Sequence, residues 1–88
     1  SFDRAFMGSC GIDMMDHTVT TLGVEDGLTK KAAIESSRHK YAVMEREKFY
    51  FNESYKFTQL DELDGIITDE FPDQSVQDML DSLGVTLY

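Results

Sequence analysis

The feature that most constrains the fold lies near the start of the chain, where a short apolar run stops at two glycines spaced three apart. It is the segment Ala5-Phe6-Met7-Gly8-Ser9-Cys10-Gly11-Ile12-Asp13. This pattern is typical of a buried strand that ends in a loop whose backbone approaches something closely. The loop could offer N–H groups to a phosphate or carboxylate, or it could simply turn the chain. Its spacing matches neither the P-loop nor the dinucleotide-binding fingerprint, so taken alone it favours the turn.

Strands and loops can be assigned along the rest of the chain from short apolar segments and the residues that bound them. The segment 8–21 is expected to be mostly loop, with 18–21 a candidate for extended backbone, and the aromatic-rich segment 45–60 is expected to be irregular. The expected strands are 2–7, 40–44, 65–68 and 85–88.

Two segments carry helical patterns. One helix is predicted over about 23–38, with Val24, Leu28 and Ala32 as its apolar stripe. Gly27 inside this segment costs roughly 1 kcal/mol relative to alanine, which weakens the prediction. The second helix is predicted to start at Pro72 and Asp73 and to stop at Gly84, and its apolar face is Val76, Met79, Leu80 and Leu83.

The order of these elements predicts an α/β fold with a mostly parallel, Rossmann-like sheet. Open sheets of this kind bind ligands outside the carboxyl ends of their strands. Three such ends lead into residues 8–11, 45–48 and 68–70. If the strands are parallel neighbours, these loops share one rim, although any parallel α/β domain places its loops in this way.

The charge of the chain is unevenly distributed. The formal net charge is −9, and it divides into −4 over residues 1–29, +3 over 30–56 and −8 over 57–88. Binding of nucleic acid by this segment is disfavoured, because phosphate contacts need a basic face. The middle third remains compatible with a small anionic ligand, but the charge pattern alone favours a solvated surface.

Size and composition limit the class of protein. The 88 residues suffice for one small domain with a modest core. The chain starts on a strand-like segment without an initiator methionine, so we expect a piece of a longer protein. The sequence shows no signal peptide and no long apolar run, so neither secretion nor membrane insertion is predicted. A single cysteine is compatible with a reducing cytoplasm.

Few individual residues carry a chemical signal. Lys48 follows a predicted strand, with Glu45 three residues before it. The lysine could meet an anion while the carboxylate accepts sugar hydroxyls, or the two could form a surface ion pair worth about 0–1 kcal/mol. Cys10 lacks a neighbouring base and is expected to be buried or half-buried rather than a nucleophile. His17 and His39 show no metal-ligand spacing, so no metal or other cofactor is predicted.

Taken in order, the motifs resemble the C-terminal effector-sensing domain of DeoR-family bacterial transcriptional repressors. Those sensors carry a strand and a G-x-x-G-I loop, then a Thr-Thr pair before a helix with an acidic residue and a lysine. A strand ending in D-x-S-K-F and a segment I-D-x-[IV]-I-T-D follow. The matching residues here are Gly8 to Asp13, Thr20-Thr21, Glu25, Lys30, Ile34 to Ser37, Glu45 to Phe49, Leu60 to Asp69 and Leu83-Gly84-Val85. Each motif is weak alone, but the ordered set is specific and covers nearly the whole chain.

The resemblance implies a fold similar to ribose-5-phosphate isomerase, the glucosamine-6-phosphate deaminases and CoA-transferase-type sensor domains. It implies a phosphorylated sugar or a sugar-pathway intermediate as effector, and DNA binding only through an N-terminal winged helix-turn-helix domain absent from this chain. A cytoplasmic homo-oligomer is expected for the full-length protein. The family's sensor is roughly twice as long, so residues 1–88 are interpreted as the C-terminal portion of such a sensor, a partial domain.

These observations predict an effector site without catalysis. Lys48 and Lys30 are the candidates for the anion and Glu45 for hydroxyls, while Asp69 is a weaker candidate on the rim. For Lys30, a solvated helix position is an equally open alternative. The loop contributes its backbone N–H groups through Gly8, Ser9, Cys10 and Gly11.

Two departures from the family pattern affect the pocket, and two other classes of function stay open. The family's aspartate and central serine are replaced by Glu45 and Glu47. Glu45 reaches further, and Glu47 adds a charge that repels phosphate unless it points away, so a different effector or weaker binding is an alternative. A fragment of a sugar-phosphate isomerase or deaminase-like enzyme is the second hypothesis, although no convincing acid–base pair is found. The third is an interaction module whose acidic face and aromatic residues serve oligomerisation.

Overall fold

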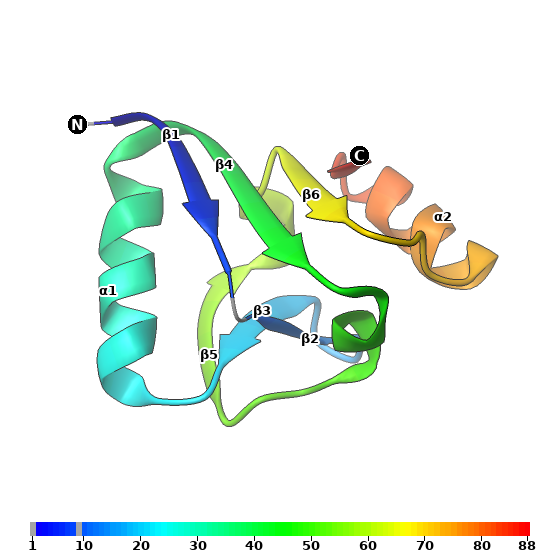
Figure 1. The fold of residues 1–88 in the computed structure, drawn as a ribbon, viewed down its shortest axis with the longest axis horizontal. Helices are drawn as coiled ribbons and strands as arrows, with labels where there is room; N and C mark the ends of the chain where they lie inside the picture. Colours follow the sequence, from blue (N-terminus) through cyan, green and yellow to red (C-terminus); the bar gives the residue numbers. More distant parts are fainter. Residues whose placement is uncertain (1, 9) are drawn as a thin grey trace.

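The computed structural model describes residues 2–8 and 10–88, which form two sheets, two helices and two 3₁₀ turns (Figure 1). The first sheet is parallel, with the strand order β1 (Phe2–Met7), β4 (Ser37–Met44), β6 (Gly65–Thr68) and β7 (Thr86–Leu87). The second is antiparallel, with the order β2 (Gly11–Asp13), β3 (Thr18–Thr21) and β5 (Tyr55–Gln59). The helices are α1 (Val24–Glu35) and α2 (Gln74–Ser82), and the turns are η1 (Arg46–Tyr50) and η2 (Leu60–Glu62). The predicted α/β class is confirmed.

Side chains alternate between the two faces of the parallel sheet, as the period of two requires. One face is buried: Ala5 and Met7 on β1, Ala42 and Met44 on β4, and Ile66 on β6 all have 8% exposure or less. Figure 1 shows α1 beside β1 and β4, with α2 at the other end of the sheet beyond β6. The side chains that meet this face include Ile34, Phe49, Leu60, Leu63, Val76 and Leu80.

The opposite face of the parallel sheet carries large side chains that no described element covers. Phe6 is 58% exposed, Val43 42% and Tyr88 58%, while Phe6 stacks on Tyr41 with ring centroids 5.3 Å apart. We call this surface the open sheet face, and it comprises Arg4, Phe6, Tyr41, Val43, Ile67 and Tyr88.

The antiparallel sheet was not expected from the sequence. The segment predicted to be loop contains β2, a strand of three residues, and the segment predicted to be irregular contains β5. Only the expectation of extended backbone at 18–21 is confirmed there, by β3. A strand of three residues is too short to display a period, and β5 pairs with a strand far from it in sequence, so neither pairing leaves a local signal.

Asp13 holds the turn between β2 and β3 together. Its Oδ1 accepts the N–H groups of Met15 at 2.9 Å and of Asp16 at 3.4 Å. Its Oδ2 accepts a hydrogen bond from Asn52 at 3.1 Å and pairs with the Lys56 ammonium at 3.3 Å. The Met15 N–H and, after it, the Lys56 ammonium hold the pKa of Asp13 below its ordinary value. Asp13, the last residue of the loop motif in the sequence, is therefore a structural element of the antiparallel sheet.

The predicted apolar stripe of the first helix is wrong. Val24 and Leu28 are 57% and 55% exposed, and α1 ends at Glu35 instead of continuing to residue 38. The buried positions of α1 are Gly27 and Ile34. A Cβ atom on Gly27 would lie 2.2 Å from Cδ2 of Tyr55, so the missing side chain is what lets the Tyr55 ring of β5 rest on the helix.

Replacing Gly27 by alanine therefore tests two opposing effects. Alanine favours helix by roughly 1 kcal/mol over glycine, but here its methyl group collides with the Tyr55 ring, and overpacking of this kind costs about 1–3 kcal/mol. We expect a net loss of up to about 2 kcal/mol in the free energy of unfolding, measured by urea denaturation. Gly23→Ala is the control, because nothing lies within 4 Å of its Cβ position. A gain in stability for Gly27→Ala would contradict the packing described here.

The second predicted helix is confirmed. It begins after Asp73, buries Val76 and Leu80, and is followed by Gly84 with a φ of 78°, a left-handed conformation that glycine adopts without strain. The last predicted strand is shorter than expected and covers Thr86–Leu87.

Candidate functional site

A cavity of about 450 Å³ opens where β4 and β6 reach their carboxyl ends. This is the edge at which open parallel sheets bind ligands. One wall of the cavity is formed by residues 43–45, at the end of β4, and another by residues 67–69, at the end of β6. Lys48 is contributed by η1. The lining residues are Cys10, Val43, Met44, Glu45, Lys48, Ile67, Thr68 and Asp69. Four residues predicted from the sequence, Cys10, Glu45, Lys48 and Asp69, thus meet at one site.

Lys48 is the one basic side chain among the described residues that line this cavity. Its ammonium lies 3.9 Å from Oε1 of Glu53 and 5.0 Å from the centroid of the Phe51 ring. The side chain is 35% exposed, and an ion pair of this length and exposure is worth about 0–1 kcal/mol. The ammonium is therefore only loosely held and can turn towards an anion in the cavity.

The rim of the cavity is acidic. The neighbouring Glu47 carboxyl group raises the pKa of Glu45 above its ordinary value, first because it can accept a hydrogen bond from the protonated Glu45 and then through its charge. The charge of Asp69 acts in the same direction, and Lys48 opposes it. Asp69 is fixed by the backbone N–H of Arg46, which donates to its Oδ1 at 3.0 Å. Glu47 does not line the cavity, but it lies close enough to Glu45 to act on that carboxyl group.

Cys10 forms an apolar wall of the cavity. It is 1% exposed, and its thiol donates to the carbonyl oxygen of Gly8 at 3.3 Å. Burial raises the pKa of the Cys10 thiol to about 11, so the sulfur keeps its proton at neutral pH. The prediction of a buried cysteine is confirmed, and a protonated thiol is a poor nucleophile.

The two glycines of the first loop differ in their surroundings. A Cβ atom on Gly11 would lie 2.3 Å from the carbonyl oxygen of Phe51, and that oxygen accepts the N–H of Ile12 at 2.8 Å. The close approach indicated by the sequence is therefore an approach of the chain to its own backbone. Gly8 is exposed with open space around it, and neither glycine lines the cavity. Ser9, which the sequence also nominated, lies outside the described residues.

Lys30 lies on the α1 side of the loop and does not line the cavity. Its ammonium bonds Oδ2 of Asp26 at 2.6 Å and Oγ1 of Thr21 at 2.9 Å. The side chain is only 12% exposed, so Lys30 is not a solvated helix residue. The Lys30 ammonium lowers the pKa of Asp26, and its charge also tends to lower the pKa of the Cys10 thiol. The lysine therefore acts on a residue of the cavity lining through its charge, while Asp26 and Thr21 hold its ammonium.

Sequence reasoning missed the apolar part of the cavity, formed by Val43, Met44 and Ile67. The detectable signal was their position at the ends of two predicted strands. Val43 and Ile67 also belong to the open sheet face, so the cavity and that face are continuous.

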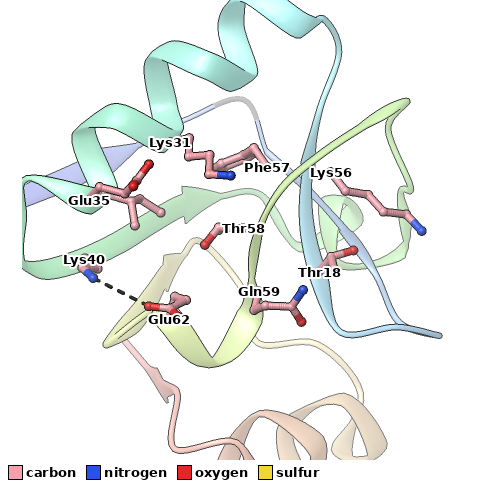
Figure 2. A pocket seen from close by; sticks show the side chains of 10 residues that line it. Thr18, Lys31, Glu35, Lys40, Lys56, Phe57, Thr58, Gln59 and Glu62 are labelled. Carbon is pink, nitrogen blue, oxygen red and sulfur yellow. Dashed lines mark ion pairs between the residues drawn. The ribbon is translucent and has the colours of Figure 1, made fainter.

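A second cavity of about 410 Å³ lies near the start of β4, between α1 and β5 (Figure 2). Figure 2 shows Lys31 and Glu35 reaching it from α1, and an ion pair between Lys40 and Glu62 at 3.8 Å. Two of its lysines are already paired, Lys40 with Glu62 and Lys56 with Asp13 and Asp16. The cavity also lies at the end of the sheet opposite to the one where parallel sheets bind ligands. The cavity at the carboxyl ends is therefore the better candidate.

Within residues 2–8 and 10–88, no helix combines the length and the apolarity needed to cross a membrane. Across the same ranges, histidine, cysteine, aspartate and glutamate side chains do not gather in groups of three or more that could hold a metal ion.

Comparison with known proteins agrees with the motifs. Residues 1–70 match the model of the DeoR C-terminal sensor domain. Over 85 residues the chain is 34% identical to the HTH-type transcriptional repressor GlcR of Bacillus subtilis (strain 168). The alignment covers 97% of this chain and 32% of the relative, so the chain spans about a third of that protein's length. The chain therefore belongs to the family of DeoR C-terminal sensor domains, which are parts of transcriptional regulators.

Proposed function

We propose that this domain senses a phosphorylated sugar, or another sugar-pathway intermediate, for a DeoR-type repressor of carbohydrate metabolism. The observation that carries the proposal is the cavity in which Cys10, Glu45, Lys48 and Asp69 meet, although they come from separate segments of the sequence. Its position at the carboxyl ends of parallel strands supports a ligand site. On this proposal, residues 1–88 are the C-terminal portion of a longer sensor.

Each polar group at the cavity has a distinct proposed role. The Lys48 ammonium meets the phosphate, because a charged donor bonds an anion strongly. Glu45 accepts sugar hydroxyls, and Asp69 is a further acceptor on the rim. We also propose that the backbone N–H groups of residues 8–11 and the Lys30 ammonium contact a part of the effector that extends beyond the cavity, because Gly8, Gly11 and Lys30 do not line it.

We propose binding without catalysis. General acid–base catalysis needs a positioned pair with suitable pKa values. Cys10 is buried and keeps its proton, and the acidic neighbours of Glu45 raise the pKa of that carboxyl, so neither is paired with a free base among the described residues that line the cavity. The relationship to a repressor supports a regulatory role over the alternative of a sugar-phosphate isomerase or deaminase-like enzyme.

The effector would act by population shift. A ligand changes the balance between two arrangements of a protein only by binding one of them more tightly. We propose that the effector favours the arrangement of the full-length, homo-oligomeric repressor that releases DNA. The DNA contact belongs to a helix-turn-helix domain outside these 88 residues, and the protein works in the cytoplasm.

A thermal-shift panel of sugar phosphates and the corresponding free sugars on the full-length repressor tests this proposal. A ligand present at 100 times its Kd stabilises the folded state by about 2.7 kcal/mol, which is readily measured as a shift in Tm. We expect at least one phosphorylated sugar to raise the Tm more than its free sugar does.

We also expect Glu47→Ser to tighten binding of that sugar phosphate several-fold, because the substitution removes a negative charge from the neighbourhood of Glu45.

Glu70→Ser serves as the control, because the Glu70 carboxylate pairs with Arg46 at 3.5 Å, whereas the Glu47 carboxylate acts on Glu45 of the cavity lining. It should leave the affinity within about twofold of the parent protein. A panel in which no sugar phosphate changes the Tm, or in which Glu47→Ser and Glu70→Ser behave alike, would count against the proposed site.

A further inference from the structure

The open sheet face is unusual for a parallel sheet. Parallel sheets occur almost only with both faces covered. Here the aromatic pair Phe6 and Tyr41 stands on the face, and the rings of Tyr41 and Tyr88 meet edge to face with centroids 6.2 Å apart. Contiguous exposed apolar patches of this kind mark surfaces where another element packs. The face therefore requires a cover.

The topology explains why the described chain leaves this face bare. The connections from β1 to β4, from β4 to β6 and from β6 to β7 all step in the same direction across the sheet. Connections between parallel strands are right-handed in about 98% of cases, so steps in one direction place every crossover on one face. That face is the buried one, where Ile34 of α1 and Leu80 of α2 lie. Helices can reach the opposite face only from strands that step the other way.

We propose that the open sheet face is covered by an amphipathic helical segment of the same polypeptide that precedes residue 1 in the full-length repressor. In the described part of the chain, β1 is an edge strand of the parallel sheet, so residues that precede it arrive at this sheet. Strands added beyond β1 and stepping away from it would place their crossover helices on the open face. This chain spans about a third of the relative's length, and the remaining two thirds are ample for such a segment.

The chemistry of the face specifies the segment further. Arg4, Phe6, Tyr41, Ile67 and Tyr88 line a shallow cavity of about 410 Å³ on it. The aromatic and aliphatic side chains call for an apolar stripe on the covering helix. Arg4 makes no hydrogen bond or ion pair within residues 2–8 and 10–88, so a carboxylate on the helix opposite it would complete the contact.

Hydroxyl-radical footprinting of the full-length repressor tests the cover without any substitution. The probe is oxidation of native aromatic side chains, read by mass spectrometry. Phe6 and Tyr88 are each 58% exposed in this structure, and Phe51 and Phe71, at 52% and 47%, are matched residues away from the face. We expect Phe6 to be oxidised at least tenfold more slowly than Phe51 and Phe71, and Tyr88 to follow Phe6. Equal rates at Phe6, Phe51 and Phe71 would overturn the proposal.

A photo-crosslinker at position 41 then identifies the occupant. Tyr41→p-benzoylphenylalanine keeps an aromatic ring at the site, and a mixture of ¹⁴N- and ¹⁵N-labelled protein separates links within one chain from links between chains. We expect links within one chain to residues upstream of residue 1. Links to residues 2–88 of another chain would assign the face to a second copy and overturn the proposal. Neither readout uses an effector. The proposal about the open sheet face can therefore be overturned while the proposed function stands, and the proposed function can be overturned while the proposal about the open sheet face stands.

Discussion

Gly11→Ala is expected to destabilise the protein by about 3 kcal/mol. The new methyl group would lie 2.3 Å from the Phe51 carbonyl oxygen and 3.0 Å from Oγ1 of Thr20, and a backbone oxygen cannot move away as the end of a flexible side chain can. Overpacking costs about 1–3 kcal/mol, and loss of the hydrogen bond from the Ile12 N–H to Phe51 adds about 1 kcal/mol. The measurement is the free energy of unfolding from urea denaturation.

Gly8→Ala is the matched control for this substitution. It stands in the same loop, but nothing lies within 4 Å of its Cβ position, so its stability should change by no more than about 0.5 kcal/mol. If both variants unfold at the same urea concentration as the parent protein, the contact between β2 and the end of η1 does not hold the fold as described.

Lys48→Ala is expected to weaken binding of the phosphorylated effector by roughly 10- to 100-fold. A hydrogen bond to a charged group contributes about 1.5–3 kcal/mol, and each 1.4 kcal/mol is a factor of ten in Kd. Stability should change little, because the pair with Glu53 is long and the side chain is partly exposed. Isothermal titration of the full-length repressor with the sugar phosphate found in the panel provides the measurement.

Lys31→Ala removes the same charge from a different place. Lys31 is exposed on α1, makes no hydrogen bond or ion pair within the described ranges, and borders the other cavity. Its loss should leave affinity within about twofold. An equal loss for both variants would mean that net charge, and not the cavity, governs binding, and an unchanged Kd for Lys48→Ala would remove the lysine from the site.

The parallel sheet could be predicted because its strands carry local signals. The apolar runs 5–7 and 66–67 are followed by turn residues, and the predicted bounds 2–7 and 65–68 agree with β1 and β6. The antiparallel sheet could not, because β5 is recognisable only through its partner β3, which lies more than thirty residues earlier. The face of α1 was misjudged for a related reason: the contact that decides it is the ring of Tyr55 on Gly27.

The position of the candidate site could be predicted from the sequence, but most contacts of its side chains could not. That Cys10, Glu45, Lys48 and Asp69 would share a rim follows from the rule that carboxyl ends of parallel strands lie together. The partner of Gly11 could not be read from the sequence, because the Phe51 backbone reaches it only after η1 has formed. The proposed roles of Glu45, Lys48 and Asp69 in effector binding remain predictions, which the experiments above test.

The one-sided winding of the sheet has a consequence for biosynthesis. A ribosome delivers the chain from its N-terminus, and domains fold during synthesis in that order. If the covering segment precedes residue 1, as proposed, it leaves the ribosome before β1. It is therefore available to pack against Phe6 and Tyr41 as soon as these residues emerge. A truncated protein that starts near β1 would lack this segment, and its aromatic surface would stay exposed throughout synthesis. We expect such a product to aggregate and to be degraded.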